Sequence, residues 1–199
     1  MTKPKQSPLP TGGWAKALAA LVLGLLAFMA TPASASAEAA DAARDFTAQA
    51  RSAGLNGTEA KGLLARVDGY LAKMPGTQAG ANKIALADGG ELLLTLPGER
   101  NARDLTAPDT GPGAAAGCPY TYVCAYPYEN FGGDELRLYT CDYLTHIPWT
   151  GTGSWINNQR STLYAKFYDV NGNLGWTSPG GYSEDRHAPW GWVWWLSPC

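Results

Sequence analysis

The sequence is poor in histidine and lacks the motifs of the common hydrolase classes. Its 199 residues include only His146 and His187, and neither belongs to an HExxH zinc motif. A GxSxG nucleophile motif is also missing. Glu184 and Asp185 are adjacent carboxylates, but only the fold could set the separation that a glycosidase pair requires. We therefore expect a protein that binds a partner and does not catalyse a reaction.

The chain also lacks an excess of positive charge. Its formal net charge is −2, and the only charges before Glu38 are Lys3, Lys5 and Lys16. Residues 38–199 therefore carry 12 Lys/Arg against 17 Asp/Glu, a net charge of −5. Binding to nucleic acid requires a basic surface that neutralises phosphates. We expect no nucleic acid among the partners.

No apolar run is long enough to favour a membrane span. The longest candidate, residues 17–30, has 14 residues, whereas a spanning helix needs roughly 20. Basic residues precede this run, and small residues, among them Ala35 and Ala37, follow it. The pattern is typical of a secretory signal peptide over residues 1–37, and a transmembrane anchor is the alternative. We expect a secreted, extracellular protein that has no membrane attachment once the signal is cleaved.

Cysteine is scarce, but its number is even. Cys118, Cys124, Cys141 and Cys199 favour two disulfides over a metal site in an oxidising compartment. Four cysteines allow three connectivities, of which we favour Cys118 with Cys124 and Cys141 with Cys199. On the chain-entropy relation the short link is worth roughly 2 kcal/mol and the long link about 4 kcal/mol. The long link should matter more for a domain of this size.

Residues 38–97 have the composition of a small α+β region with two helices and a hairpin. Residues 38–53 are rich in alanine, and a second, amphipathic helix is predicted from Thr58 to the Pro75-Gly76 break. Residues 82–96 predict a hairpin around Asp88-Gly89-Gly90. The region is typical of a prosegment, and a semi-ordered spacer is the alternative. Residues 98–117 predict a linker whose proteolysis would release residues 118–199.

Aromatic residues concentrate in residues 118–199. This segment holds 18 of the chain's 22 Trp, Tyr and Phe residues. Short apolar runs separated by Gly, Asn and Pro predict β-strands in a two-sheet sandwich. The predicted strands are Tyr122–Tyr126, Glu135–Tyr139, Thr162–Asp169 and Val193–Leu196.

Two similar segments in this aromatic region carry a family resemblance. In AYPYENFGG, the spacing of Tyr126, Phe131 and Gly133 predicts a folded-over hairpin with an aromatic lid. FYDVNGNLG, residues 167–175, repeats the pattern about forty residues later. These hairpins resemble those of a βγ-crystallin domain. Together with the Cys-x5-Cys opening, they resemble peptidase inhibitor family thirty-six, the Streptomyces metalloproteinase inhibitor type.

The resemblance covers residues 118–199 and implies a Greek-key sandwich, so that the expected fold class is mainly β. Two positions depart from the family pattern. Pro127 stands where the first hairpin usually has Glu, and Asn173 stands where the second hairpin should have its lid aromatic. The first hairpin is therefore the better match.

The resemblance also implies one calcium ion bound near Asn157-Asn158-Gln159-Arg160-Ser161-Thr162. Asn158 would supply its side chain, Gln159 its backbone carbonyl and Ser161 its hydroxyl. Asp169 would supply its backbone carbonyl from the second hairpin. Calcium requires six to eight oxygen ligands, and few of these would be charged, so that binding should be weak. The alternative is that these Asn and Ser side chains terminate a strand through hydrogen bonds to the backbone.

Two functions of different classes follow. The first, implied by the resemblance, is a peptidase inhibitor that inserts a rigid loop into the cleft of an extracellular peptidase. The disulfide-constrained loop with Tyr120 and Tyr122 is the candidate. The second is a calcium-stabilised module that binds cell-wall glycan or another extracellular partner through exposed tryptophan. The candidate residues for this surface are Trp190, Trp192, Trp194 and Trp195, although core packing would absorb some of them.

Overall fold

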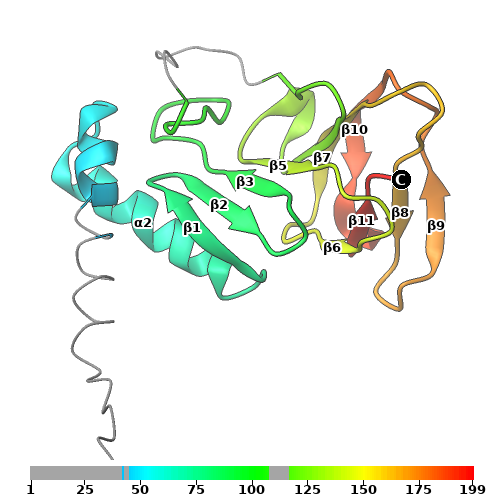
Figure 1. Cartoon of the computed structure of the whole chain (residues 1–199), viewed down its shortest axis with the longest axis horizontal. Helices are drawn as coiled ribbons and strands as arrows, with labels where there is room; N and C mark the ends of the chain where they lie inside the picture. The colour runs from blue at the N-terminus through cyan, green and yellow to red at the C-terminus, as the bar shows by residue number, and fades with distance from the viewer. Residues whose placement is uncertain (1–41, 43–44, 108–116) are drawn as a thin grey trace, which may run out of the picture.

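The computed structural model describes residue 42, residues 45–107 and residues 117–199. The expected signal peptide, residues 1–37, and residues 108–116 of the expected linker lie outside this range. The described chain is mainly β, with two antiparallel sheets and two short helices, as Figure 1 shows. The expectation of a mainly β fold is thus confirmed.

Within the described residues, the first sheet has seven strands in the order β1-β2-β3-β5-β4-β7-β10, and the second has four in the order β6-β11-β8-β9. The strands of the first sheet are β1 (Gly76–Gly80), β2 (Lys83–Leu86), β3 (Glu91–Leu93), β5 (Glu135–Leu138), β4 (Tyr122–Tyr126), β7 (Thr152–Asn158) and β10 (Ser183–Pro189). Those of the second sheet are β6 (Thr145–His146), β11 (Trp195–Ser197), β8 (Lys166–Tyr168) and β9 (Leu174–Thr177).

The strands of residues 118–199 form two sets of four that exchange one strand each. In the first set, β4, β5 and β7 lie in the first sheet and β6 lies in the second. In the second set, β8, β9 and β11 lie in the second sheet and β10 lies in the first. Each set therefore depends on the other to complete its sheet.

Helix α2 (Gly57–Leu71) begins at a capping box. The Oδ1 atom of Asn56 accepts hydrogen bonds from the backbone N–H groups of Thr58 and Glu59, at 2.9 and 3.0 Å. The Glu59 carboxylate accepts from the backbone N–H of Asn56 at 2.8 Å. Such caps satisfy N–H groups that the first turn leaves without a partner. The helix buries Leu63 and Val67, in agreement with the predicted amphipathic pattern, but it ends before the Pro75-Gly76 break.

The predicted hairpin around Asp88-Gly89-Gly90 is formed by β2 and β3, and it does not stand apart from the C-terminal strands. Strand β3 pairs antiparallel with β5, with Leu92 opposite Leu136. Asp134, which precedes β5, binds Tyr70 of α2 at 2.7 Å and the backbone N–H of Thr95 at 2.8 Å. Strands from both sides of the expected linker, from β1 to β10, therefore belong to one sheet.

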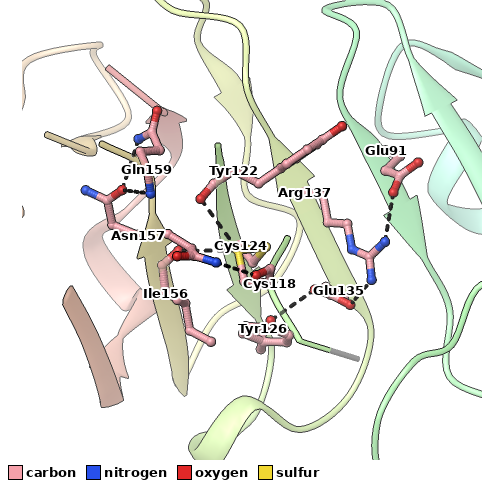
Figure 2. Close-up of a disulfide and its surroundings, with 11 residues drawn as sticks. Glu91, Cys118, Tyr122, Cys124, Tyr126, Glu135, Arg137, Ile156, Asn157 and Gln159 are labelled. Atoms are coloured by element: carbon pink, nitrogen blue, oxygen red, sulfur yellow. Dashed lines mark hydrogen bonds and ion pairs between the residues drawn. A yellow bond between two sulfur atoms is a disulfide. The ribbon is translucent and has the colours of Figure 1, made fainter. Parts of the chain in front are cut away.

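A chain of charged and phenolic side chains crosses this β3–β5 junction, as Figure 2 shows. Arg137 binds Glu91 at 3.0 Å and Glu135 at 2.9 Å. Tyr126 donates a hydrogen bond from its hydroxyl to Glu135 at 3.0 Å. Glu135 is 0% exposed, and its burial raises the pKa of its carboxyl group against the opposing effect of Arg137. Its charge is accommodated by these two donors.

The structure corrects the strand prediction for residues 118–199. Strand β4 coincides with the predicted Tyr122–Tyr126 strand, but β7 and β10 were not predicted. The sequence of β7, TGSWINN, is rich in polar residues and glycine and is therefore typical of a turn. In the structure Ser154 is fully buried, where it donates to the carbonyl of Tyr128 at 2.7 Å and accepts from the backbone N–H of Phe131 at 2.8 Å.

The same two bonds hold the predicted folded-over hairpin between β4 and β5. The ring of Phe131 packs edgewise against Tyr126, with 5.6 Å between the ring centroids. Gly133 has φ of +92°, and a side chain there would overlap Pro127. A residue other than glycine would be strained in this conformation. The second hairpin, between β8 and β9, instead closes through an Asx turn at Asp169.

Candidate functional site

A cleft lined by tryptophan lies between β9, β10 and the 3₁₀ turn η2 (Trp190–Trp192). Its volume is about 360 Å³, within the range of small-molecule sites. We call it the tryptophan cleft. Its lining residues are Trp155, Phe167, Gly175, Trp176, Asp185, Ala188, Pro189, Trp190, Trp192 and Val193.

The tryptophan cleft has a buried aromatic floor and two accessible indoles. Trp155, Phe167 and Trp190 are buried, and they belong to the core shared by the two sheets. Trp176 packs on this floor, with its centroid 5.2 Å from that of Phe167 and 5.6 Å from that of Trp155. Trp176 and Trp192 remain 42% and 38% exposed. The floor holds the ring of Trp176 in place, so that a ligand would meet a preformed surface there.

Strand register places one carboxylate beside these rings. Asp185 of β10 lies directly opposite Trp155 of β7, so both side chains point to the same face of the first sheet. Glu184 lies opposite Ile156 and therefore points to the other face. The adjacent carboxylates noted in the sequence are thus separated by the sheet.

A close approach of backbone and ring fixes the second accessible indole. Trp192 lies against Gly175 of β9, and a Cβ atom on Gly175 would overlap its six-membered ring. Glycine is the one residue that leaves room for the indole here. The ring of Trp192 is therefore held against the edge of the second sheet.

The tryptophans near the C-terminus do not form the single surface that the sequence predicts. Trp190 is buried, and its indole N–H donates to the carbonyl of Tyr126 at 2.8 Å. Trp192 lines the tryptophan cleft, whereas Trp194 and Trp195 line a different cavity. Residues 190–192 form a 3₁₀ turn and β11 begins only at Trp195, so these tryptophans do not alternate along one strand.

His146 lines a second cavity, which has a volume of about 440 Å³. Trp194, 45% exposed, packs on the histidine ring with 5.9 Å between centroids. The Nδ1 atom of His146 is buried and has no hydrogen-bond partner in the described part of the chain. Burial and the nearby Lys73 lower the pKa of this imidazole. The cavity thus holds a neutral histidine between aromatic rings near neutral pH.

The disulfide loop of residues 118–124 presents one aromatic side chain to solvent. Cys118 bonds with Cys124 and Cys141 with Cys199, which is the connectivity that the sequence analysis favours. Tyr120 is 63% exposed, whereas Tyr122 packs edgewise on Tyr139 at 5.2 Å.

The backbone of this loop forms a tight turn. The N–H of Tyr122 bonds to the carbonyl of Pro119 at 3.2 Å, and Thr121 has φ of +80°. An extended, substrate-like backbone would have negative φ at this position. The loop therefore offers the side chain of Tyr120 to a partner, and its backbone does not run as an extended strand.

The hexapeptide predicted to bind calcium is organised by Asn157, which is fully buried (Figure 2). Its side-chain oxygen accepts from the backbone N–H of Gln159 at 3.2 Å, and its amide donates to the carbonyl of Leu163 at 3.0 Å. Asn158 donates to the carbonyl of Cys118 at 2.8 Å. These are the hydrogen bonds to backbone that the alternative interpretation of the hexapeptide requires.

Two of the oxygens assigned to calcium by the resemblance already have close contacts within the chain. Gly181 packs directly against the Gln159 carbonyl. The Asp169 carbonyl accepts from the backbone N–H of Gly172 at 3.1 Å, within the β8–β9 turn. Two of the four assigned oxygens, the carbonyls of Gln159 and Asp169, are thus covered or hydrogen-bonded, whereas calcium requires six to eight oxygen ligands.

Sequence reasoning did not place Trp155, Trp176 and Asp185 in a site. The high aromatic content of residues 118–199 was a signal for the two tryptophans. The position of Asp185 depends on the pairing of β7 with β10, and neither strand has a sequence pattern typical of a strand. A prediction of that pairing would have been needed to find the carboxylate.

Comparison with protein-family models, with curated proteins and with solved structures finds no match to this chain. Within residues 45–107 and 117–199, no helix has the length and apolar character required to cross a membrane. Over the same residues, no three His, Cys, Asp or Glu side chains are grouped so as to hold a metal ion.

Proposed function

We propose that this protein is a secreted, non-catalytic module that binds extracellular glycan in the tryptophan cleft. The observation that carries the proposal is the pair of accessible indoles in a cleft with Asp185: Trp176 packs on the buried aromatic floor, and Trp192 packs against Gly175. Indole rings offer a large, rigid apolar face with a polar N–H at one edge. The C–H face of a pyranose ring matches this surface, and its hydroxyl groups match the polar edge.

Two further features support a sugar as the ligand. In the described residues, the indole N–H groups of Trp176 and Trp192 have no hydrogen-bond partner, so both can donate to sugar oxygens. The free oxygen of Asp185 can accept from a hydroxyl group. A site that is apolar with a few polar groups is typical of small-ligand recognition.

The test is a binding titration against soluble oligosaccharides, read by tryptophan fluorescence and by calorimetry. Trp176→Ala and Trp192→Ala should each weaken binding by about 2 kcal/mol or more, as central aromatic contacts do. Trp194→Ala is the matched control, because it removes an equally exposed indole outside the cleft. Loss of binding in the control, with both cleft variants unaffected, would refute the proposal.

We also propose that residues 118–199 belong to the βγ-crystallin-like branch named by the sequence resemblance. The exchange of β6 and β10 between the sheets supports this, because a pair of Greek-key sets produces such an exchange. The aromatic lid formed by Phe131 on Tyr126 supports it as well. The second hairpin has an Asx turn in place of a lid, in keeping with Asn173 at that position.

Inhibition of an extracellular peptidase is the second candidate function. The exposed Tyr120 at the tip of the disulfide loop supports it. Because the loop backbone is a turn, the insertion would consist of the Tyr120 side chain entering a pocket of the peptidase. Titration against a panel of extracellular peptidases tests this. Stoichiometric inhibition that is lost in Tyr120→Ala would support it, and unchanged peptidase activity at micromolar protein would refute it.

A further inference from the structure

The tryptophan cleft has a single charged group among the described residues that line it, and that group is acidic. The Oδ1 atom of Asp185 accepts a hydrogen bond from the backbone N–H of His187 at 2.8 Å. Its Oδ2 atom accepts none from the described residues, although the side chain is partly buried next to indole rings. Asp185 therefore brings to the lining of the cleft an acceptor oxygen that has no partner among the described residues.

The nearest cation in the sequence is engaged on the opposite face of the sheet. Arg186 binds Glu184 at 2.9 Å, and its guanidinium lies over the ring of Phe131 at 4.5 Å from the centroid. Glu184 points away from the cleft because it is opposite Ile156 in the register. No cation in the described structure neutralises Asp185 within the tryptophan cleft.

Indole faces and a carboxylate both favour a positively charged ligand. The negative face of an indole attracts a cation, and this attraction increases as the cation loses water. A carboxylate attracts the same cation and repels phosphate, uronate and other anions. The charge of the cleft therefore complements a positively charged sugar.

Resting on the proposed glycan binding, we infer that the tryptophan cleft selects an amino sugar, a glucosamine unit with a free ammonium group, over its N-acetylated form. The pyranose ring packs on the indole of Trp176 or Trp192, and the ammonium donates a hydrogen bond to Oδ2 of Asp185. N-acetylation removes the positive charge and places a methyl group against the carboxylate. Glucosamine polymers and de-N-acetylated wall glycan share this chemistry.

The test compares the affinity of the full chain for glucosamine and N-acetylglucosamine oligomers of equal length, and for a glucuronate oligomer. We expect the glucosamine oligomer to bind at least about tenfold more tightly than the N-acetylated one, the ratio typical of a hydrogen bond to a charged group. The glucuronate oligomer should bind more weakly than either. A second arm that compares a glucosamine polymer with de-N-acetylated wall glycan distinguishes these two sources, since the stronger binder identifies the natural one.

Asp185→Asn should abolish the preference for glucosamine, because it keeps the size of the side chain and removes its charge. Asp68→Asn is the matched control, as it makes the same change at an exposed position of α2. Equal affinity for both oligomers in the unmodified protein would overturn the inference while leaving the proposed glycan binding intact. Absence of binding to every oligomer would overturn both. The comparison of oligomers is decisive even without a folded Asp185 variant.

Discussion

Removal of the Arg137 guanidinium should destabilise the protein strongly, because it leaves a buried carboxylate with one donor. In the native structure Glu135, 0% exposed, is bound by Arg137 at 2.9 Å and by the Tyr126 hydroxyl at 3.0 Å. Arg137 also binds Glu91 at 3.0 Å across the β3–β5 junction. Arg137→Met keeps the length of the side chain, and therefore much of its packing, but removes both ion pairs.

The expected cost at pH 7 is about 3–5 kcal/mol, the range for breaking a buried ion pair by removing one partner. A protein of this size has a total stability of about 5–15 kcal/mol, so the variant would retain a fraction of it. The loss of stability should be much smaller when the Glu135 carboxylate is removed as well. Glu135→Gln combined with Arg137→Met should therefore be more stable than Arg137→Met alone.

The destabilisation should also depend on pH. Burial raises the pKa of Glu135 above the unfolded value of about 4.3, so the folded state holds the proton more tightly. A raised folded-state pKa contributes stability that is fully present below the unfolded pKa and is lost as the pH rises through the folded pKa. Without Arg137 the pKa rises further. The cost of Arg137→Met should therefore be smaller at pH 4.5 than at pH 7.

Equilibrium unfolding in guanidinium chloride, with the disulfides intact, measures these differences. Arg160→Met is the control, since Arg160 is exposed, and it should change stability by less than about 0.5 kcal/mol. A cost of under 1 kcal/mol at pH 7, or equal costs at the two pH values, would contradict the expected effect of a buried Glu135 carboxylate without Arg137. A double variant no more stable than Arg137→Met would contradict it as well.

Three further predictions concern the disulfides, the expected linker and calcium. Replacement of Cys141 and Cys199 by serine should lower the free energy of unfolding by about 4 kcal/mol, because the bond closes a separation of 58 residues; an effect below 1 kcal/mol would contradict this. Proteolysis within residues 108–116 should leave the two fragments together in gel filtration, because β3 and β5 share one sheet; elution of free residues 118–199 would contradict this. Calcium should not raise the Tm, because Gly181 covers the Gln159 carbonyl; a rise of several degrees would show that the segment rearranges to bind the ion.

Local sequence signals predicted the parts of the fold that depend on neighbouring residues. The existence of α2, of strand β4 and of the Phe131 lid is set in each case by residues that are close in the sequence. Strands β7 and β10 depend on distant partners instead. The buried polar groups of β7 are satisfied by a hairpin more than twenty residues away, as for Ser154 and Tyr128, so the strand appears polar in sequence.

The candidate site shows the same division between local and distant determinants. The sequence marks the abundance of tryptophan, but the role of each indole depends on which segment comes against it. Trp190 is buried because Gly153, which has no side chain, admits its ring beside the Tyr126 carbonyl. Trp192 is held at the cleft by Gly175 in the same way. Gly153 in the first sheet and Gly175 in the second thus separate a buried tryptophan from a cleft-lining one two residues later. No periodicity within residues 190–195 could distinguish them.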